Sequence, residues 1–249
     1  MAVRIVDVED EATFGLIPPC ADPSFDHRSC DYWEDADRGS KRARPVAAAQ
    51  GAATPARPPN PFGDEDDEPA FNPFAPTRDG ASINPFAPTA DPLADNPFAP
   101  ARKTRRTIAA DAPRKLSLLG RGLGVFGSYA KLLLVDDRPT AYAQFGPLSA
   151  YPRAARVREL YSQLPESPLP AVITCIATTA EGRGEGHART LVEAVCDDLA
   201  GRGFAAVEVY PEPHRDPNAT SAATPEFWIA AGFGLAVIDD RYPVMRREL

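Results

Sequence analysis

The sequence predicts an α/β fold in which a mixed central sheet is flanked by helices and interrupted by a long disordered Pro-rich insertion. Three observations support this class: a β-hairpin pattern at residues 131–145, a buried strand followed by an amphipathic helix at 171–201, and a further strand at 204–210. A helix between two strands forms a crossover connection, so those two strands are expected to be parallel.

The hairpin pattern opens the regular part of the chain. Residues 131–135 are apolar, residues 136–139 have the composition of a turn, and residues 140–145 form the return strand. Residues 153–164 are expected to form a helix that ends before Pro165.

The strand at 171–178 is apolar on both faces, as expected of a central strand. The helix after it places its apolar side chains on one face, at Ala188, Leu191, Val192, Val195 and Leu199. Gly201 and Gly203 end this helix. The remaining expected elements are a strand leading into a helix at 3–10, a short helix at 225–231, and strands at 235–238 and 243–247.

The chain divides into three parts: residues 1–39, with the opening strand and helices; a disordered linker at 40–112; and the core at 113–249. Asn-Pro-Phe occurs in the linker at Asn60, Asn72, Asn84 and Asn96, with almost no aliphatic residues between the copies. Such a segment buries too little apolar surface to offset the entropy lost on folding.

The repeats have two interpretations. Asn and Pro favour a turn that presents the next side chain, so in the first interpretation the phenylalanines are equivalent anchors for a protein partner: Phe62, Phe74, Phe86 and Phe98. Alternatively, the repeats are a duplicated spacer.

Composition excludes several classes of function. A net charge of -8 argues against binding to nucleic acid, which requires a basic surface. The sequence has no apolar run long enough to span a membrane and no secretory h-region at its start. With no export signal, the four cysteines are expected to be reduced and the protein cytoplasmic.

A glycine-rich loop links the buried strand to the amphipathic helix and reads Arg183-Gly184-Glu185-Gly186-His187-Ala188. The start of a helix offers several backbone N–H groups and a partial positive charge, which together suit a pyrophosphate. The glycines let the backbone approach phosphate, and Arg183 adds a charged contact. The alternative is a plain turn between a strand and a helix.

This loop, with the later segment Phe227-Trp228-Ile229-Ala230-Ala231-Gly232-Phe233, resembles the GNAT N-acetyltransferases. The resemblance covers residues 116–249, with 3–34 as opening elements, and the Ala/Arg/Pro-rich style is typical of a bacterial protein. It implies a GNAT-like sheet and acetyl-CoA as co-substrate, with its pyrophosphate on the loop. It also implies that the pantetheine arm pairs with the backbone of Ile176, Ala177 and Thr178.

The resemblance implies less about catalysis. The family commonly uses a carboxylate to accept the amine proton and a Tyr to protonate the thiolate, but this chain has Trp228 where that Tyr is expected. Glu208 is the expected base, because burial makes a carboxyl group hold a proton more readily; the alternative is an outward charge on an edge strand. Tyr210 and Glu226 are further candidates, whereas His187 is expected to face solvent or phosphate.

His27 and Cys30 are spaced as in metal sites, but no second His/Cys pair follows. We therefore expect no metal, and interpret this segment as a packed lobe on the substrate side.

The sequence thus predicts an acetyl-CoA-dependent N-acetyltransferase whose acceptor is an amine of a small molecule or a protein. The alternative is a non-catalytic GNAT-like scaffold that recruits partners through the Asn-Pro-Phe repeats.

Overall fold

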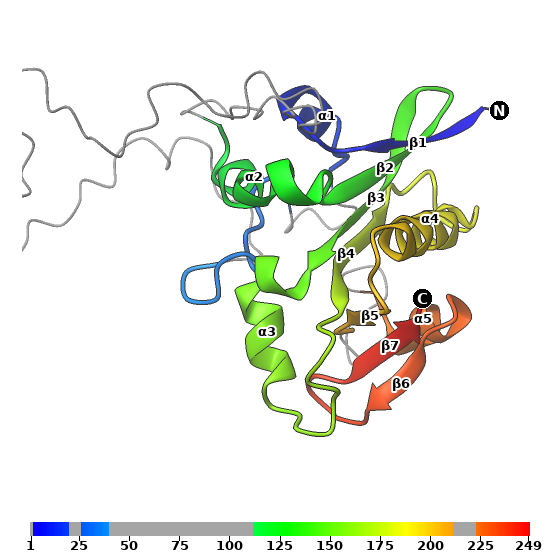
Figure 1. Ribbon diagram of the computed structural model, residues 1–249. Coiled ribbons are helices and arrows are strands. Elements are labelled where there is room, and N and C mark those ends of the chain that lie inside the picture. Colours follow the sequence, from blue (N-terminus) through cyan, green and yellow to red (C-terminus); the bar gives the residue numbers. More distant parts are fainter. Residues whose placement is uncertain (1, 20–25, 40–111, 212–222) are drawn as a thin grey trace, which may run out of the picture. The chain divides into compact units, whose positions relative to one another are not determined.

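The computed structural model describes residues 2–19, 26–39, 112–211 and 223–249 (Figure 1). They all belong to one compact unit, formed by residues 1–44 and 105–249. The expected disordered linker, apart from Ala112, and the four Phe side chains of the repeats lie outside the described residues.

The elements follow one another in this order: β1 (Val3–Asp7), α1 (Glu11–Gly15), α2 (Arg114–Phe126), β2 (Ala130–Val135), β3 (Arg138–Pro147), α3 (Pro152–Arg158), β4 (Ala171–Thr178), α4 (His187–Gly201), β5 (Ala206–Val209), α5 (Pro225–Ala230), β6 (Gly234–Val237) and β7 (Val244–Glu248).

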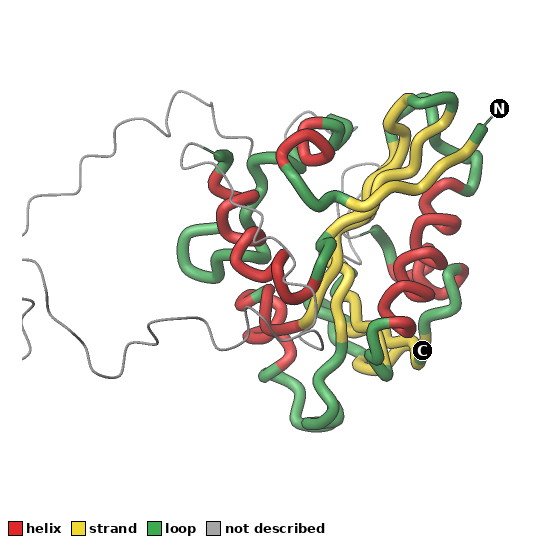
Figure 2. Tube along the Cα trace, turned by 45° about the horizontal axis from the view of Figure 1, so that its top comes forward, coloured by secondary structure: helices red, strands yellow, loops and turns green. Residues whose placement is uncertain are grey.

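Within the described residues, the strands form one seven-stranded sheet in the order β1-β2-β3-β4-β5-β7-β6. β4 and β5 run parallel, and the other neighbouring strands are antiparallel. Helices lie on both faces of this sheet (Figure 2). The α/β class with a mixed sheet flanked by helices is therefore confirmed.

Successive side chains of a strand point to opposite faces of the sheet, so the apolar residues form two cores, one on each face. Leu132 and Leu134 of β2 contribute to the first core, which also contains side chains of α1, α2 and α3. Leu133, between them, contributes to the second core, which α4 and α5 cover. Each face of the sheet is thus buried by its own set of helices.

The turn of the β2–β3 hairpin is shorter than the four-residue turn expected at residues 136–139. Asp136 and Asp137 both have positive φ, 46° and 63°, and Val135 pairs with Arg138. This is a two-residue turn of the kind that matches strand twist, so the return strand already begins at Arg138. No helix among the described residues is long and apolar enough to cross a membrane.

Candidate functional site

The parallel strands β4 and β5 separate soon after they meet. They pair only at Ala171 with Val207 and at Val172 with Glu208. Antiparallel pairing with β3 continues along β4 as far as Thr178. From residue 173 to 178, the edge of β4 that faces β5 therefore has no strand partner among the described residues. Such an edge presents backbone N–H and C=O groups that can bind an extended ligand, and Ile176, Ala177 and Thr178 lie in it.

The loop after β4 is fixed at its beginning and exposed at its end. The Thr179 N–H donates to the Thr140 carbonyl at 2.8 Å, and the Gly182 N–H donates to the Thr179 carbonyl at 3.2 Å. A Cβ at residue 182 would lie 2.3 Å from Thr140 Cγ2, so a larger residue there requires the Thr140 side chain to move. Gly182 is thus a tightly packed position of the loop that the sequence motif did not indicate.

The second half of the loop leads to the start of α4. Gly184 and Gly186 have φ values of 80° and 79°, and a Cβ on either would meet nothing within 4 Å. Gly186 is the N-cap of α4 and supplies no side-chain cap, so the N–H groups of the first turn have no intrahelical acceptor. Arg183 and Glu185 are exposed beside them. An anion can therefore reach this helix start without hindrance.

His187 differs from its expected orientation. The imidazole is buried, with 8% of its surface exposed, and Ala188 after it is half-buried. His187 can therefore offer its backbone N–H to a ligand, but its side chain belongs to the packing beneath the loop.

Glu208 is fully buried in the middle of the sheet. Arg158 Nε lies 3.0 Å from Glu208 Oε2, Arg246 Nη1 lies 2.8 Å from Oε1, and the Tyr210 hydroxyl donates to Oε2 at 3.2 Å. The alternative of an outward charge on an edge strand is wrong, because β5 lies between β4 and β7. Two guanidinium groups thus contact the carboxylate, one at each oxygen. These contacts favour a structural ion-pair role, and the assignment of Glu208 as the base stays a prediction.

The other catalytic candidates lie in different surroundings. Burial, with the nearby Glu208 charge, raises the pKa of Tyr210, so its hydroxyl keeps its proton. Glu226 is at the exposed start of α5, where a hydrogen bond to its own backbone N–H lowers its pKa. Trp228 is buried in the second core, with its ring 4.9 Å from that of Phe233. Trp228 therefore has a packing role where the family motif would place an acid.

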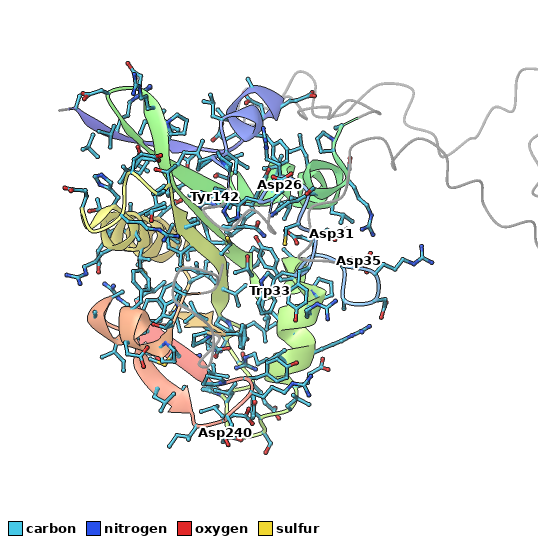
Figure 3. The ribbon with its side chains drawn as sticks, turned by 180° about the vertical axis from the view of Figure 1, so that it is seen from behind. Asp26, Asp31, Trp33, Asp35, Tyr142 and Asp240 are labelled. Atoms are coloured by element: carbon cyan, nitrogen blue, oxygen red, sulfur yellow. The ribbon has the colours of Figure 1, made fainter. Side chains whose placement is uncertain are left out.

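Residues 26–39, here called the N-terminal lobe, pack against α2 and α3 (Figure 3). Arg114 of α2 forms ion pairs with Asp31 and Asp35, and Arg153 of α3 donates to the Tyr32 carbonyl at 2.6 Å. The Trp33 ring lies 5.9 Å from the ring of Tyr210, immediately after β5. The lobe thus covers one face of the region where β4 and β5 separate.

A small cavity of about 10 Å³, lined by both apolar and polar side chains, lies between the lobe, α2 and the strands β3 and β4. Its walls include His27, Trp33, Glu34, Lys115, Gln144 and Thr174. His27 Nε2 and Thr174 Oγ1 are buried and have no hydrogen-bond partner among the described residues. A cavity of this size holds about one water molecule, provided that polar groups surround it.

A chain of hydrogen bonds fixes the other polar walls. The Tyr142 hydroxyl donates to Gln144 Oε1 at 2.9 Å, and Gln144 Nε2 donates to Glu34 Oε1 at 2.6 Å. Lys115 Nζ donates to the His27 carbonyl at 2.7 Å and lies 3.7 Å from Glu34 Oε1. Burial alone would lower the pKa of Lys115, but Glu34 and neighbouring groups raise it, so the ammonium stays charged.

His27 Nε2 is the basic atom of this network that has no hydrogen-bond partner among the described residues. Burial, followed by the charge of Lys115, lowers the pKa of His27 to about 4, and Asp26 opposes this only in part. The imidazole is therefore neutral at neutral pH. Among the described residues, no group of three or more His, Cys, Asp or Glu side chains is arranged to hold a metal ion.

No protein-family model matches the sequence, and no curated protein matches it. Among solved structures, PaiA N-acetyltransferase of Thermoplasma acidophilum in complex with coenzyme A is similar at 11% identity and a TM-score of 0.37, covering 54% of this chain and 70% of that one. The ribosomal-protein-S18-alanine N-acetyltransferase of Escherichia coli is similar at 19% identity and a TM-score of 0.30, covering 48% and 66%.

N-acetylglutamate synthase of Neisseria gonorrhoeae, complexed with coenzyme A and N-acetyl-glutamate, is similar at 15% identity and a TM-score of 0.34. The match covers 49% of this chain and only 26% of the synthase. At such values the likeness identifies no ligand or substrate, so the chemistry below is derived from the residues of this chain.

Proposed function

We propose that this protein is an acetyl-CoA-dependent N-acetyltransferase of the GNAT type, which transfers an acetyl group to an amine. The observation that carries the proposal is the continuity of two features: the unpaired edge of β4 from residue 173 to 178, and the exposed glycine loop that follows it to the start of α4. An extended amide-containing arm suits the first feature, and a pyrophosphate suits the second. Coenzyme A contains both groups in one molecule.

In this proposal the cofactor-binding residues are those of the open edge and the loop: Ile176, Ala177, Thr178, Arg183, Gly184, Glu185, Gly186, His187 and Ala188. The strand supplies backbone hydrogen bonds to the pantetheine arm. The helix start supplies N–H groups to the phosphates, and Arg183 adds charge beside them. Since the open edge also adjoins the cavity under the N-terminal lobe, the thioester end of the bound molecule would lie on the side of that cavity.

A pair of matched glycine substitutions tests the phosphate loop. Gly186 and Gly203 stand at opposite ends of α4, with φ values of 79° and 85°, and a Cβ on either would meet no neighbour. Gly186→Ala and Gly203→Ala should therefore destabilise the fold equally, by about 1–2 kcal/mol each, because both place an L-residue in a left-handed conformation. Only Gly186→Ala should weaken acetyl-CoA binding, by roughly tenfold or more, because it puts a methyl group on the anion-binding surface.

The measurement is calorimetry with acetyl-CoA, combined with urea unfolding of both variants. Release of free thiol from acetyl-CoA in the presence of spermidine, tyramine, glucosamine and a lysine-containing peptide then measures transfer. Absence of acetyl-CoA binding to the wild-type protein, or equal affinity in the two variants, would overturn the assignment. Binding without thiol release would favour the non-catalytic scaffold.

A further inference from the structure

We propose that His27 is the proton acceptor of the transfer reaction, and that it takes the amine proton through one water molecule held between His27 Nε2 and Thr174 Oγ1. This rests on the proposed acetyl transfer and adds the residue that makes the amine reactive. Both atoms belong to side chains that line the same cavity, and neither has a hydrogen-bond partner among the described residues. Their side chains are buried, with 3% and 2% of the residue surface exposed.

Thr174 connects the cavity to the open edge of β4. The pairing of β3 with β4 shifts register here, because Gln144 pairs with Cys175 and Phe145 pairs with Ile173. Thr174 is thus the extra residue of a bulge, a feature that re-aims a side chain. It also lies two residues beyond Val172, the last position of β4 that pairs with β5. A water on Thr174 Oγ1 is therefore next to the stretch of strand that would hold the thioester.

The carboxylate and amide side chains that line the cavity have partners of their own. Glu34 accepts from Gln144 and faces the Lys115 ammonium, and Gln144 is held by both Glu34 and Tyr142. Glu208, on the neighbouring strand, is held between Arg158 and Arg246. His27 lines the cavity, and its Nε2 atom has no hydrogen-bond partner among the described residues, unlike the oxygens of Glu34 and Glu208.

The surroundings of His27 set which nitrogen carries the proton. His27 Nδ1 lies 3.5 Å from Cys175 Sγ, and the tautomer decides which of the two donates. In the proposal Nδ1–H donates to the sulfur, which leaves the Nε2 lone pair directed to the water. The centroid of the Tyr142 ring lies 5.3 Å from that of the imidazole. Lys115 and Glu34 line the same cavity as His27, and Asp26 precedes His27 in the chain.

The proposed step conserves atoms and electrons. The amine nitrogen attacks the thioester carbon, a C–N bond forms and the C–S bond breaks, and the electron pair of that bond leaves on sulfur. The nitrogen gives its proton to the water, which gives one of its own to His27 Nε2. The imidazolium then returns a proton through the water to the thiolate, so the products are an amide and a thiol, and His27 is neutral again.

The decisive measurement needs no acceptor. The chain contains three histidines, so ¹⁵N-histidine NMR of the whole protein gives few signals, and His27→Gln assigns those of His27. At pH 7 the proposal requires Nε2 to show the shift of an unprotonated nitrogen and Nδ1 that of an N–H. A protonated Nε2 would overturn the proposal, even if the protein binds acetyl-CoA and the proposed function holds.

Kinetics with acetyl-CoA and the fastest amine of the panel supply the second readout. His27→Gln should lower kcat by roughly a hundredfold, since a general base contributes about that much or more. Thr174→Val, which removes only the hydroxyl that holds the water, should lower kcat by about tenfold, the value of one hydrogen bond. Acetyl-CoA affinity measured by calorimetry should stay unchanged in both variants and shows that they are folded.

Tyr129→Phe is the matched control. The Tyr129 hydroxyl is also buried without a hydrogen-bond partner among the described residues, but Tyr129 is not part of the cavity wall. Its removal should leave kcat unchanged. A loss in Tyr129→Phe equal to that in Thr174→Val would mean that packing, not the water, causes the effect. If Glu208→Gln abolishes transfer in a folded protein while His27→Gln retains it, the proton acceptor is Glu208 and the proposal falls.

Discussion

Burial lowers the pKa of His27 from its ordinary value of 6.5 to about 4, which couples the stability of the fold to pH. In the unfolded chain the imidazole binds a proton below about pH 6.5, whereas in the folded protein it does so only below about pH 4. Between these values the unfolded state binds more protons, so stability is lost as the pH falls.

The expected size of this loss follows from the shift. At pH 4.5 the wild-type protein should have lost about 2 kcal/mol more unfolding free energy, relative to pH 7, than His27→Gln, in which this group does not titrate. Urea unfolding of both proteins at the two pH values measures the difference. If the wild-type protein and His27→Gln lose the same unfolding free energy between pH 7 and pH 4.5, His27 is accessible to solvent in the folded protein.

The residues of the candidate site differ in how far the sequence could indicate them. The glycine loop is contiguous, and its chemistry depends on backbone N–H groups at a helix start, so the motif at Arg183 and Gly186 could be recognised directly. The cavity is different, because His27, Gln144 and Thr174 come from separate segments and meet only through packing. For Gln144 and Thr174 the sequence signal is a polar side chain within an apolar strand pattern, and for His27 it is only the spacing to Cys30. Neither signal shows which segments are neighbours.

At the scale of elements, the most important helix for the cavity was not predicted. α2 begins with Arg114 and Lys115 and contains three glycines, Gly120, Gly122 and Gly124. Glycine has a low helix propensity. Leu116, Leu119 and Leu123 nevertheless repeat at helical spacing and are buried in the first core. Tertiary packing of this apolar face thus overrides the low helix propensity of the glycines, and the leucine spacing was a sequence signal for α2.

α2 and the N-terminal lobe are joined by a buried ion pair. The side chains of Lys115 and Glu34 are 3% and 2% exposed. Lys115→Met should reduce unfolding free energy by about 3–5 kcal/mol, because it leaves the Glu34 charge buried without its cation. Adding Glu34→Gln removes that charge and keeps an oxygen for Gln144, so the double variant should be more stable than Lys115→Met alone.

Urea unfolding of the two single variants and the double variant measures this coupling. Arg156→Ala is the control, because Arg156 and Asp37 form an exposed pair at 2.8 Å between α3 and the same lobe, with 58% and 73% of the side chains exposed. Loss of this exposed pair in Arg156→Ala should lower the free energy of unfolding by less than about 1 kcal/mol. Strictly additive effects of Lys115→Met and Glu34→Gln would show that the ion pair does not hold the lobe to α2.

At the scale of the whole molecule, one sheet is assembled from parts of the chain on both sides of the insertion. β1 pairs with β2 along five residues, and the buried side chains of Phe14 and Trp33 complete the first core. His27 from one side of the insertion meets Thr174 from the other in the cavity. Among the described residues, the candidate site is therefore incomplete without the N-terminal part.

We propose that the Asn-Pro-Phe repeats act independently of the proposed acetyl-CoA site. We propose that Phe62, Phe74, Phe86 and Phe98 are equivalent anchors for one kind of pocket on a partner protein, because each follows an Asn-Pro pair that favours a turn. One Phe should bind weakly by itself, whereas linked copies raise the effective concentration at the partner. Replacing one Phe by Ala should thus weaken recruitment modestly, and replacing all four should abolish it.

The test compares the wild-type protein, Phe62→Ala and the quadruple Phe→Ala variant in pulldowns from the native cell extract, with acetyl-CoA affinity measured on the same preparations. The affinity should be equal in all three proteins, because the strand edge, the loop and the cavity lie in the unit formed by residues 1–44 and 105–249. If the quadruple variant retains the same partners, the repeats are a spacer. If it loses acetyl-CoA binding, the insertion contributes to the cofactor site and the two functions are not separate.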